Sequence, residues 1–178
     1  IDRLIALLLR DQGTLCTAIE SDFGRRSAEN SRLFDILPPL NALKYARKHL
    51  PDWIRPERRR TNFPYGLLGA RAQVQYIPAG VVGNISPWNF PVTLALSPMG
   101  GILAAGNRVM IKPSEYTPAT SELMRELIAR DFDASEIAVV TGDAAVAAEF
   151  SRLPFDHLVF TGSTSVARID CDTSITSI

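Results

Sequence analysis

The sequence has few cysteines, no long hydrophobic run and no excess of charge of either sign. Its two cysteines, Cys16 and Cys171, are too few and too far apart for a disulfide framework or a metal-binding pattern. The first apolar run, residues 4–9, is too short to cross a membrane and ends at Arg10. The 19 basic and 19 acidic side chains cancel, which gives no reason to expect nucleic acid or an anionic membrane as a partner. We therefore expect a cytoplasmic protein that binds no metal.

What is present is the composition of an ordinary globular protein, with 46% hydrophobic and 21% charged residues over 178 positions. This length can bury one sizeable core. Near the N-terminus, residues 4–19 and 33–50 carry apolar side chains at helical spacing. Pro38 and Pro39 interrupt the second stretch, so a kink or two abutting helices are expected there. Residues 1–70 are thus predicted to form a helical N-terminal segment.

The chain becomes polar between residues 51 and 64, around the basic triplet 58–60. A loop with a solvated triplet is the favoured interpretation, and contact with phosphate or nucleic acid is the less favoured one. Polar and apolar residues then alternate over 71–77, which predicts a half-exposed strand that Pro78 ends.

The remainder of the chain alternates between strand and helix patterns. The small and apolar residues that follow Pro91 suit one packed helix between two strands, which makes a parallel unit. Thr117 and Pro118 are expected to begin the next helix, because proline suits the first helical position. Strands are predicted at residues 81–85, 109–111, 137–140 and 157–160, with further helices at 118–130 and 144–150. Four strands alternating with three helices predict an α/β fold with a doubly wound parallel sheet.

Polar residues follow three of the predicted strands, at the sheet edge where ligands bind. Asn89 follows the first strand, and its neutral amide could donate a hydrogen bond to an oxyanion on an attacked carbonyl. The alternative is that Asn89 caps the helix beginning at Pro91, since asparagine is a favoured cap residue. Spacing alone favours neither interpretation.

Lys112 and Glu115 follow the second of these strands and are close enough in sequence to reach one ligand. A carboxylate there can accept hydrogen bonds from two ribose hydroxyls and would repel a 2′-phosphate. Taken alone, the two residues are more simply interpreted as a surface ion pair. After the last strand, Gly162 and neighbouring hydroxyl residues offer backbone N–H groups to a phosphate, whereas Gly142 could be only a turn residue.

Four motifs occur in order on successive predicted strands: SPWNFP, KPSE, VVTGD and FTGST. Together they resemble the aldehyde dehydrogenase superfamily, and the match covers residues 71–168 strongly. The flanking sequences, such as YIPAGVVG and LPFDHLVFTGST, look most like the coniferyl-aldehyde dehydrogenase branch. The resemblance implies a Rossmann-like cofactor domain and the NAD(P)-dependent oxidation of an aldehyde to a carboxylic acid.

The resemblance also implies roles for single residues. Asn89 matches the asparagine that donates to the oxyanion of the thiohemiacetal, and Lys112 and Glu115 match residues that hold the adenosine ribose. Glu115 favours NAD, although family members with this glutamate can also accept NADP. Gly162 and Ser163 match the turn that binds the pyrophosphate. The full set of positions that matches the cofactor site is Ile85, Ser86, Pro87, Trp88, Lys112, Ser114, Glu115, Gly142, Phe160, Thr161, Gly162, Ser163 and Val166.

The sequence departs from the family after residue 168. The family's nucleophilic cysteine lies in a G-Q-x-C-type motif and its general base in an E-L-G-G-K-type motif, and neither occurs here. Cys171 stands in another context, IDCDTS, too close to the FTGST turn to be the nucleophile. The reaction needs both a thiolate and a base, so residues 1–178 are not expected to catalyse it alone. We expect residues 71–168 to be an incomplete NAD-binding domain and 169–178 to be an unassigned tail.

The resemblance also predicts the substrate and the partners. The substrate is an aldehyde, with coniferyl aldehyde or a similar hydroxycinnamic aldehyde ahead of a medium-chain aliphatic one. Residues 71–77 match a strand that takes part in dimer contacts, so a homodimer or a higher homo-oligomer is expected. The alternatives to part of an enzyme are a nucleotide-binding module without redox chemistry and an oligomerisation module.

Overall fold

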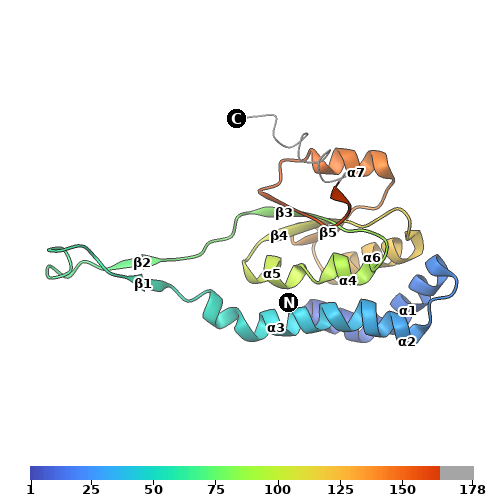
Figure 1. Ribbon diagram of the computed structural model, residues 1–178, viewed down its shortest axis with the longest axis horizontal. Coiled ribbons are helices and arrows are strands. Elements are labelled where there is room, and N and C mark those ends of the chain that lie inside the picture. The colour runs from blue at the N-terminus through green and yellow to red at the C-terminus, as the bar shows by residue number, and fades with distance from the viewer. Residues whose placement is uncertain (165–178) are drawn as a thin grey trace.

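A computed structural model of the protein describes residues 1–164 (Figure 1). These residues form a parallel sheet with helices on both faces, a further layer of N-terminal helices, and a two-stranded arm that extends to one side. Each part corresponds to a different pattern in the sequence.

The first N-terminal pattern forms a long helix, α1 (Asp2–Phe23). Its apolar stripe, which includes Leu8 and Ile19, is fully buried in the core. Gly24 ends the helix in the left-handed conformation with φ 72°, and its N–H donates to the Glu20 carbonyl at 2.7 Å. The prediction of a helix over this stretch is confirmed.

The second helical pattern lies within residues 28–53, which form three joined pieces. They are α2 (Ala28–Ser31), a π-helical turn η1 (Arg32–Ile36) and α3 (Leu37–Trp53). Pro38 and Pro39 lie in the first turn of α3, where an N–H has no helical partner to lose. The predicted interruption at the prolines is confirmed, and it takes the form of a π-helical turn.

The prediction of a loop over residues 51–64 is wrong in two places. Helix α3 continues through Pro51, which lies in the last turn, where only one helical hydrogen bond is lost. Beyond it, β1 (Glu57–Arg59) pairs antiparallel with β2 (Ala72–Val74). The basic triplet therefore begins on a strand, because a distant segment supplies the backbone partner that local composition does not predict.

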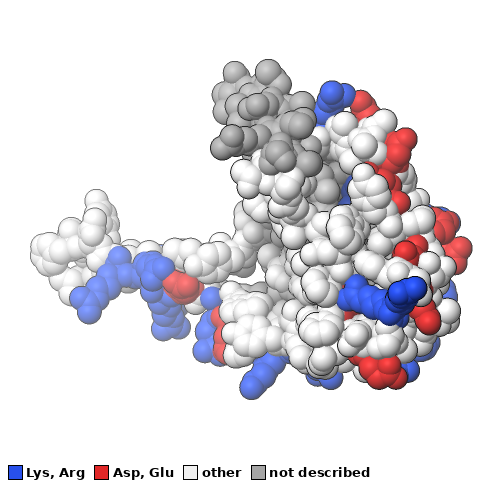
Figure 2. Space-filling model, turned by 45° about the vertical axis from the view of Figure 1, so that its right-hand side comes forward, with Lys and Arg blue, Asp and Glu red and all other residues white. Residues whose placement is uncertain are grey.

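Strands β1 and β2 form an arm that extends away from the body (Figure 1). The strand predicted over residues 71–77 exists but is shorter, and its surroundings are exposed rather than half-buried. Tyr76 and Ile77, just beyond β2, retain 64% and 78% of their accessible area. Figure 2 shows Lys and Arg side chains gathered along one side of the arm. Those that line a shallow groove there are Arg58, Arg59, Arg60 and Arg71.

The body is built on a four-stranded parallel sheet with the strand order β5-β4-β3-β6. The strands are β3 (Val81–Ile85), β4 (Arg108–Lys112), β5 (Ile137–Val139) and β6 (His157–Phe160). The chain moves outward from β3 to β5 and then returns to the other side of β3 with β6, so the direction of the connections reverses between β3 and β6. This is a doubly wound sheet, and the predicted fold class is confirmed.

Helices cover both faces of the sheet (Figure 1). One face carries α4 (Pro91–Leu96), α5 (Met99–Ala104) and α6 (Pro118–Asp131), and the other carries α7 (Ala144–Ser151). The outer layer packs on the first of these faces, with α1 against α6 and α3 against α5. Within residues 1–164, none of the helices has the length and apolar content needed to cross a bilayer.

The single helix expected after Pro91 is instead divided at Pro98 into α4 and α5. Proline cannot donate a backbone hydrogen bond, so the helical ladder is interrupted there. The carbonyl of Ala95, near the end of α4, accepts a hydrogen bond at 2.8 Å from the side-chain amide of Asn84 on β3. Asn84 is fully buried, so the break in the helix is anchored to the centre of the sheet.

Helix α6 is capped by a side chain from another helix. The residue before it, Thr117, makes no capping hydrogen bond with its own side chain. Asp22, at the end of α1, accepts hydrogen bonds from the N–H groups of Ala119 and Thr120 at 3.0 and 2.8 Å. The orphan N–H groups of α6 therefore depend on the N-terminal segment.

We expect Asp22→Ala to lower the free energy of unfolding by about 1 kcal/mol, because two N–H groups of α6 lose their acceptor. Asp52→Ala is the matched control, since the Asp52 side chain is 71% exposed and its ion pair with Arg55 lies at the surface. Urea denaturation followed by circular dichroism measures both variants. Equal midpoints would contradict the capping role.

Candidate functional site

The carboxyl ends of β3, β4 and β6 border a cleft of about 520 Å³, at the point where the sheet connections reverse. The parallel register places Ile85 beside Lys112 on one side and beside Phe160 on the other, so the three strands end together. The loops after these strands and one side of α7 line the cleft. The predicted cofactor residues found there are Ile85, Ser86, Pro87, Trp88, Lys112, Ser114, Glu115, Phe160, Thr161, Gly162 and Ser163.

Lys112 lies at the floor of the cleft and is only 1% exposed. Its Nζ donates to the Pro113 carbonyl at 2.7 Å. Burial lowers the pKa of the Lys112 ammonium, and the charges of Glu115 and Asp143 act in the opposite direction. The interpretation of Lys112 and Glu115 as a surface ion pair is wrong, because the Lys112 side chain is buried.

Ser86 brings a second polar group to the same place. Its backbone N–H donates to the Lys112 carbonyl at 3.1 Å, which joins the ends of β3 and β4. Its side chain is 3% exposed, and the hydroxyl oxygen has no hydrogen-bond partner among the described residues. Buried hydroxyls are normally satisfied, so the Ser86 hydroxyl is an exception within the wall of the cleft.

Small and apolar residues form the opposite wall. Ala144, Ala147 and Ala148 of α7 present only methyl groups to the cleft. At the end of β6, a Cβ added at Gly162 would lie 2.6 Å from the ring of Phe160. A side chain at this position of the FTGST motif would therefore require the Phe160 ring to move. The predicted Val166 lies outside the described residues, as does Cys171.

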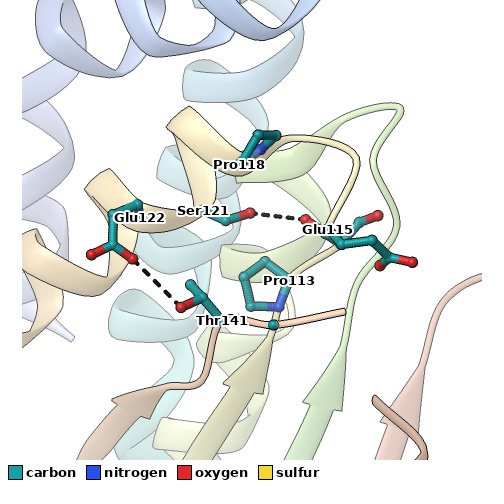
Figure 3. A pocket seen from close by; sticks show the side chains of 8 residues that line it. Pro113, Glu115, Pro118, Ser121, Glu122 and Thr141 are labelled. Carbon is teal, nitrogen blue, oxygen red and sulfur yellow. Dashed lines mark hydrogen bonds between the residues drawn. The ribbon is translucent and has the colours of Figure 1, made fainter. Parts of the chain in front are cut away.

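Gly142 is the one described cofactor candidate that does not line this cleft. It lies in an adjoining pocket of about 270 Å³ between the start of α6 and the loops after β4 and β5 (Figure 3). Its φ of 153° is unfavourable for other residues, and an added Cβ would lie 2.6 Å from Val146. The turn interpretation of Gly142 is supported by this geometry, and its place near a cofactor remains a prediction.

Two hydrogen bonds hold the walls of this smaller pocket together (Figure 3). The Ser121 hydroxyl donates to the Ser114 carbonyl at 3.1 Å, and the Thr141 hydroxyl donates to Glu122 at 3.4 Å. Ser114 lines both the pocket and the cleft, so these bonds also brace the loop after β4.

Asn89 lies in the turn between β3 and α4, directly after the cleft-lining Trp88, and is exposed. The helix-cap alternative for Asn89 is wrong, because the residue before α4 is Phe90 and the acceptor for its first N–H groups is Asp35. None of the described residues hydrogen-bonds with the Asn89 side-chain amide. The amide is therefore available to a ligand.

Two residues near this turn were missed from the sequence, Arg26 and Asp35. Asp35 is fully buried, and burial raises the pKa of its carboxyl, while the charge of Arg26 and two backbone N–H groups act in the opposite direction. A carboxylate inside the apolar pattern of residues 33–50 is the signal that could have identified it, since a buried carboxylate needs partners. No comparable local signal marks Arg26.

A doubly wound sheet with a cleft where its connections reverse defines an α/β protein of the dinucleotide-binding class. Within this class, residues 1–170 match the aldehyde dehydrogenase family, and the chain belongs to that family. The resemblance stated from the motifs is thereby confirmed.

Several relatives are similar over almost the whole chain. It is 52% identical over 168 residues to the coniferyl aldehyde dehydrogenase of Pseudomonas sp. (strain HR199 / DSM 7063), covering 94% of this chain and 34% of that protein. It is 51% identical over 169 residues to the probable coniferyl aldehyde dehydrogenase of Caulobacter vibrioides, covering 94% and 35%. The chain thus spans about a third of the length of these relatives.

Solved structures agree. The substrate-bound state of Staphylococcus aureus AldH superimposes with a TM-score of 0.89 at 31% identity, covering 97% of this chain and 37% of that one. PnpE in complex with nicotinamide adenine dinucleotide superimposes with a TM-score of 0.81 at 29% identity, covering 96% and 34%. The layered α/β arrangement is therefore that of aldehyde dehydrogenases.

The burial of Lys112 predicts a pH dependence. Between its lowered pKa and the ordinary lysine value of about 10.4, the unfolded chain holds one more proton at this position than the folded chain. The stability of the protein therefore rises with pH across this window, and it is lowest where Lys112 is charged in both states. Lys112→Met lacks this ionisation, so the wild type should gain stability relative to the variant as the pH rises into this window. Urea denaturation over a pH series measures the difference.

Lys48→Met, at an exposed position on α3, is the control and should keep the pH profile of the wild type. Parallel profiles for the wild type and Lys112→Met would show that burial of this amine does not disfavour its charged form.

Proposed function

We propose that the whole protein is an NAD-dependent aldehyde dehydrogenase of the cytoplasm, and that residues 71–168 supply its cofactor-binding part. The observation that carries the proposal is the cleft, which gathers the predicted cofactor residues from three strand ends beside Asn89. Membership of the family supplies the reaction class, the oxidation of an aldehyde to a carboxylic acid.

The residues of the cleft fit a dinucleotide. Its volume of about 520 Å³ lies within the range of small-molecule sites. Lys112 and Glu115 would hold the hydroxyls of a ribose, and Ser86 lines the same cleft. The backbone at Gly162 and Ser163 would hold the pyrophosphate. When bound, NAD supplies the hydride acceptor.

The described residues supply part of the remaining chemistry. The Asn89 amide would donate a hydrogen bond to the oxyanion that forms when the aldehyde carbonyl is attacked. The reaction also needs a thiolate and a general base. Cys16 is unsuited to the first role, because it lies in the core and burial raises the pKa of its thiol.

Coniferyl aldehyde is the proposed substrate. Identities of 52% and 51% to two proteins named for this aldehyde support it. A medium-chain aliphatic aldehyde is the second candidate. We also propose that the arm formed by β1 and β2 contacts a second copy in a homodimer or larger homo-oligomer, since it leaves Tyr76 and Ile77 exposed.

We expect Asn89→Ala to lower kcat by about 10² to 10³ in the whole protein, because the oxyanion loses a donor. NADH formation from NAD and coniferyl aldehyde is the measurement. Asn41→Ala, at an exposed position on α3, is the control and should retain full activity. A wild-type protein that binds NAD but oxidises no aldehyde would overturn the proposal in favour of a nucleotide-binding module.

Glu115→Gln tests the choice of cofactor. The amide keeps the shape of the carboxylate but has one acceptor oxygen in place of two. It also lacks the negative charge that strengthens hydrogen bonds from ribose hydroxyls and repels a 2′-phosphate. We expect the affinity for NAD to fall by about tenfold or more, and the preference for NAD over NADP to shrink. Isothermal titration with each dinucleotide measures both effects, with the exposed Glu126→Gln as the control. An unchanged ratio of the two affinities would show that Glu115 does not face the ribose.

A further inference from the structure

The guanidinium of Arg26 lies at a junction between the N-terminal segment and the Asn89 turn. Its Nη1 donates to the carbonyl of Asn89 at 3.0 Å, and its Nη2 lies 2.5 Å from Oδ2 of Asp35. The Arg26 side chain is 13% exposed and that of Asp35 is fully buried. The contact with Asn89 is thus made by a side chain that is itself held in place.

Asp35 uses its other oxygen to hold the far end of the same turn. Its Oδ1 accepts hydrogen bonds from the N–H groups of Val92 and Thr93 at 3.2 and 3.4 Å. In addition, the Thr93 hydroxyl donates to the carbonyl of Phe34 at 2.5 Å. The Asp35 carboxylate therefore joins Arg26 to the start of α4. Asn89 lies in the turn just before this helix, and its own carbonyl is bonded to Arg26.

Aromatic rings enclose the junction. The Arg26 guanidinium lies 5.0 Å from the ring centroids of both Phe23 and Phe90. Phe90 also contacts the ring of Phe34, and Trp88 contacts that of Phe23, at centroid distances of 6.1 and 6.3 Å. Both neighbours of Asn89 in the chain therefore rest on the N-terminal segment.

The side-chain amide of Asn89 is itself exposed and bonded to none of the described residues. The backbone of its turn sets the position of its Cα–Cβ bond and the rotamers that it can adopt, and that backbone is held by Arg26 and Asp35. Because donors to a developing charge act only when they are aimed in advance, a misplacement of about 1 Å can cost a large factor in rate.

We propose that Arg26 and Asp35 are positioning residues that aim the Asn89 amide at the reacting carbonyl oxygen. This inference rests on the proposed function, since it concerns the efficiency of that reaction. It assigns the N-terminal segment a part in stabilising the transition state, whereas the sequence predicted only that this segment is helical. The two side chains touch neither substrate nor cofactor and act through Asn89.

The test is Arg26→Lys in the whole protein, with coniferyl aldehyde and NAD. Lysine keeps the charge beside Asp35, but a single ammonium cannot reproduce the planar fork that serves Asp35 and the Asn89 carbonyl together. We expect kcat to fall by about tenfold or more, with KM for NAD and for the aldehyde within about twofold of the wild type. Arg47→Lys, in the exposed ion pair with Asp2, is the control and should change neither.

A double variant separates positioning from a general loss of structure. If Arg26 acts through Asn89, Arg26→Lys should have no further effect on kcat in the Asn89→Ala background. If the two effects multiply, the positioning role is overturned. Should Arg26→Lys fail to fold, Phe90→Leu removes one of the rings that enclose Arg26 and is tested in the same two backgrounds. A wild type without aldehyde oxidation overturns the proposed function and this inference together, whereas an active wild type with a fully active Arg26→Lys overturns only this inference.

Discussion

The N-termini of α4 and α6 are capped from outside the sheet, and the shape of the cleft depends on these caps. Neither Phe90 nor Thr117, the residues before the two helices, caps its helix with its own side chain. The first N–H groups of a helix need acceptors, and Asp35 and Asp22 of the N-terminal segment supply them. The loops just before these helices line the cleft. The N-terminal helices are therefore part of the scaffold of the site.

The parallel sheet imposes the second constraint. Its register ends three strands at the same level, which brings the SPWNFP, KPSE and FTGST motifs to one edge although they are distant in sequence. The reversal of the connections beside β3 leaves that edge open, because no crossover helix covers both sides of it. Lys112 and the Ser86 hydroxyl are buried at this edge. The cleft thus combines a rigid frame with polar residues in its lining.

Much of the fold could be predicted, and the failures at the arm and at the site share one cause. Helix α7 follows its own cap, Asp143, which accepts from the N–H groups of Ala145 and Val146 within one turn of chain. Local signals of this kind allowed the helix and the four sheet strands to be predicted from the sequence. The basic triplet, assigned to a loop, instead begins on strand β1, because the pairing partner of this strand lies elsewhere in the chain. The same holds at the site, where Asn89 was identified by its motif but its supports, Arg26 and Asp35, were not.

The sequence by itself determined the alternation of strands and helices, the doubly wound class and the polar residues at the strand ends, because periodicity, turn residues and proline positions act over a few neighbouring residues. Only the tertiary structure decided which side chains meet. It separated Gly142 from the main cleft, buried Lys112, and set Asp22 and Asp35 against helices that begin far along the chain. These contacts depend on how whole elements pack, since a buried carboxylate or a helix N-terminus finds its partner in space rather than in sequence.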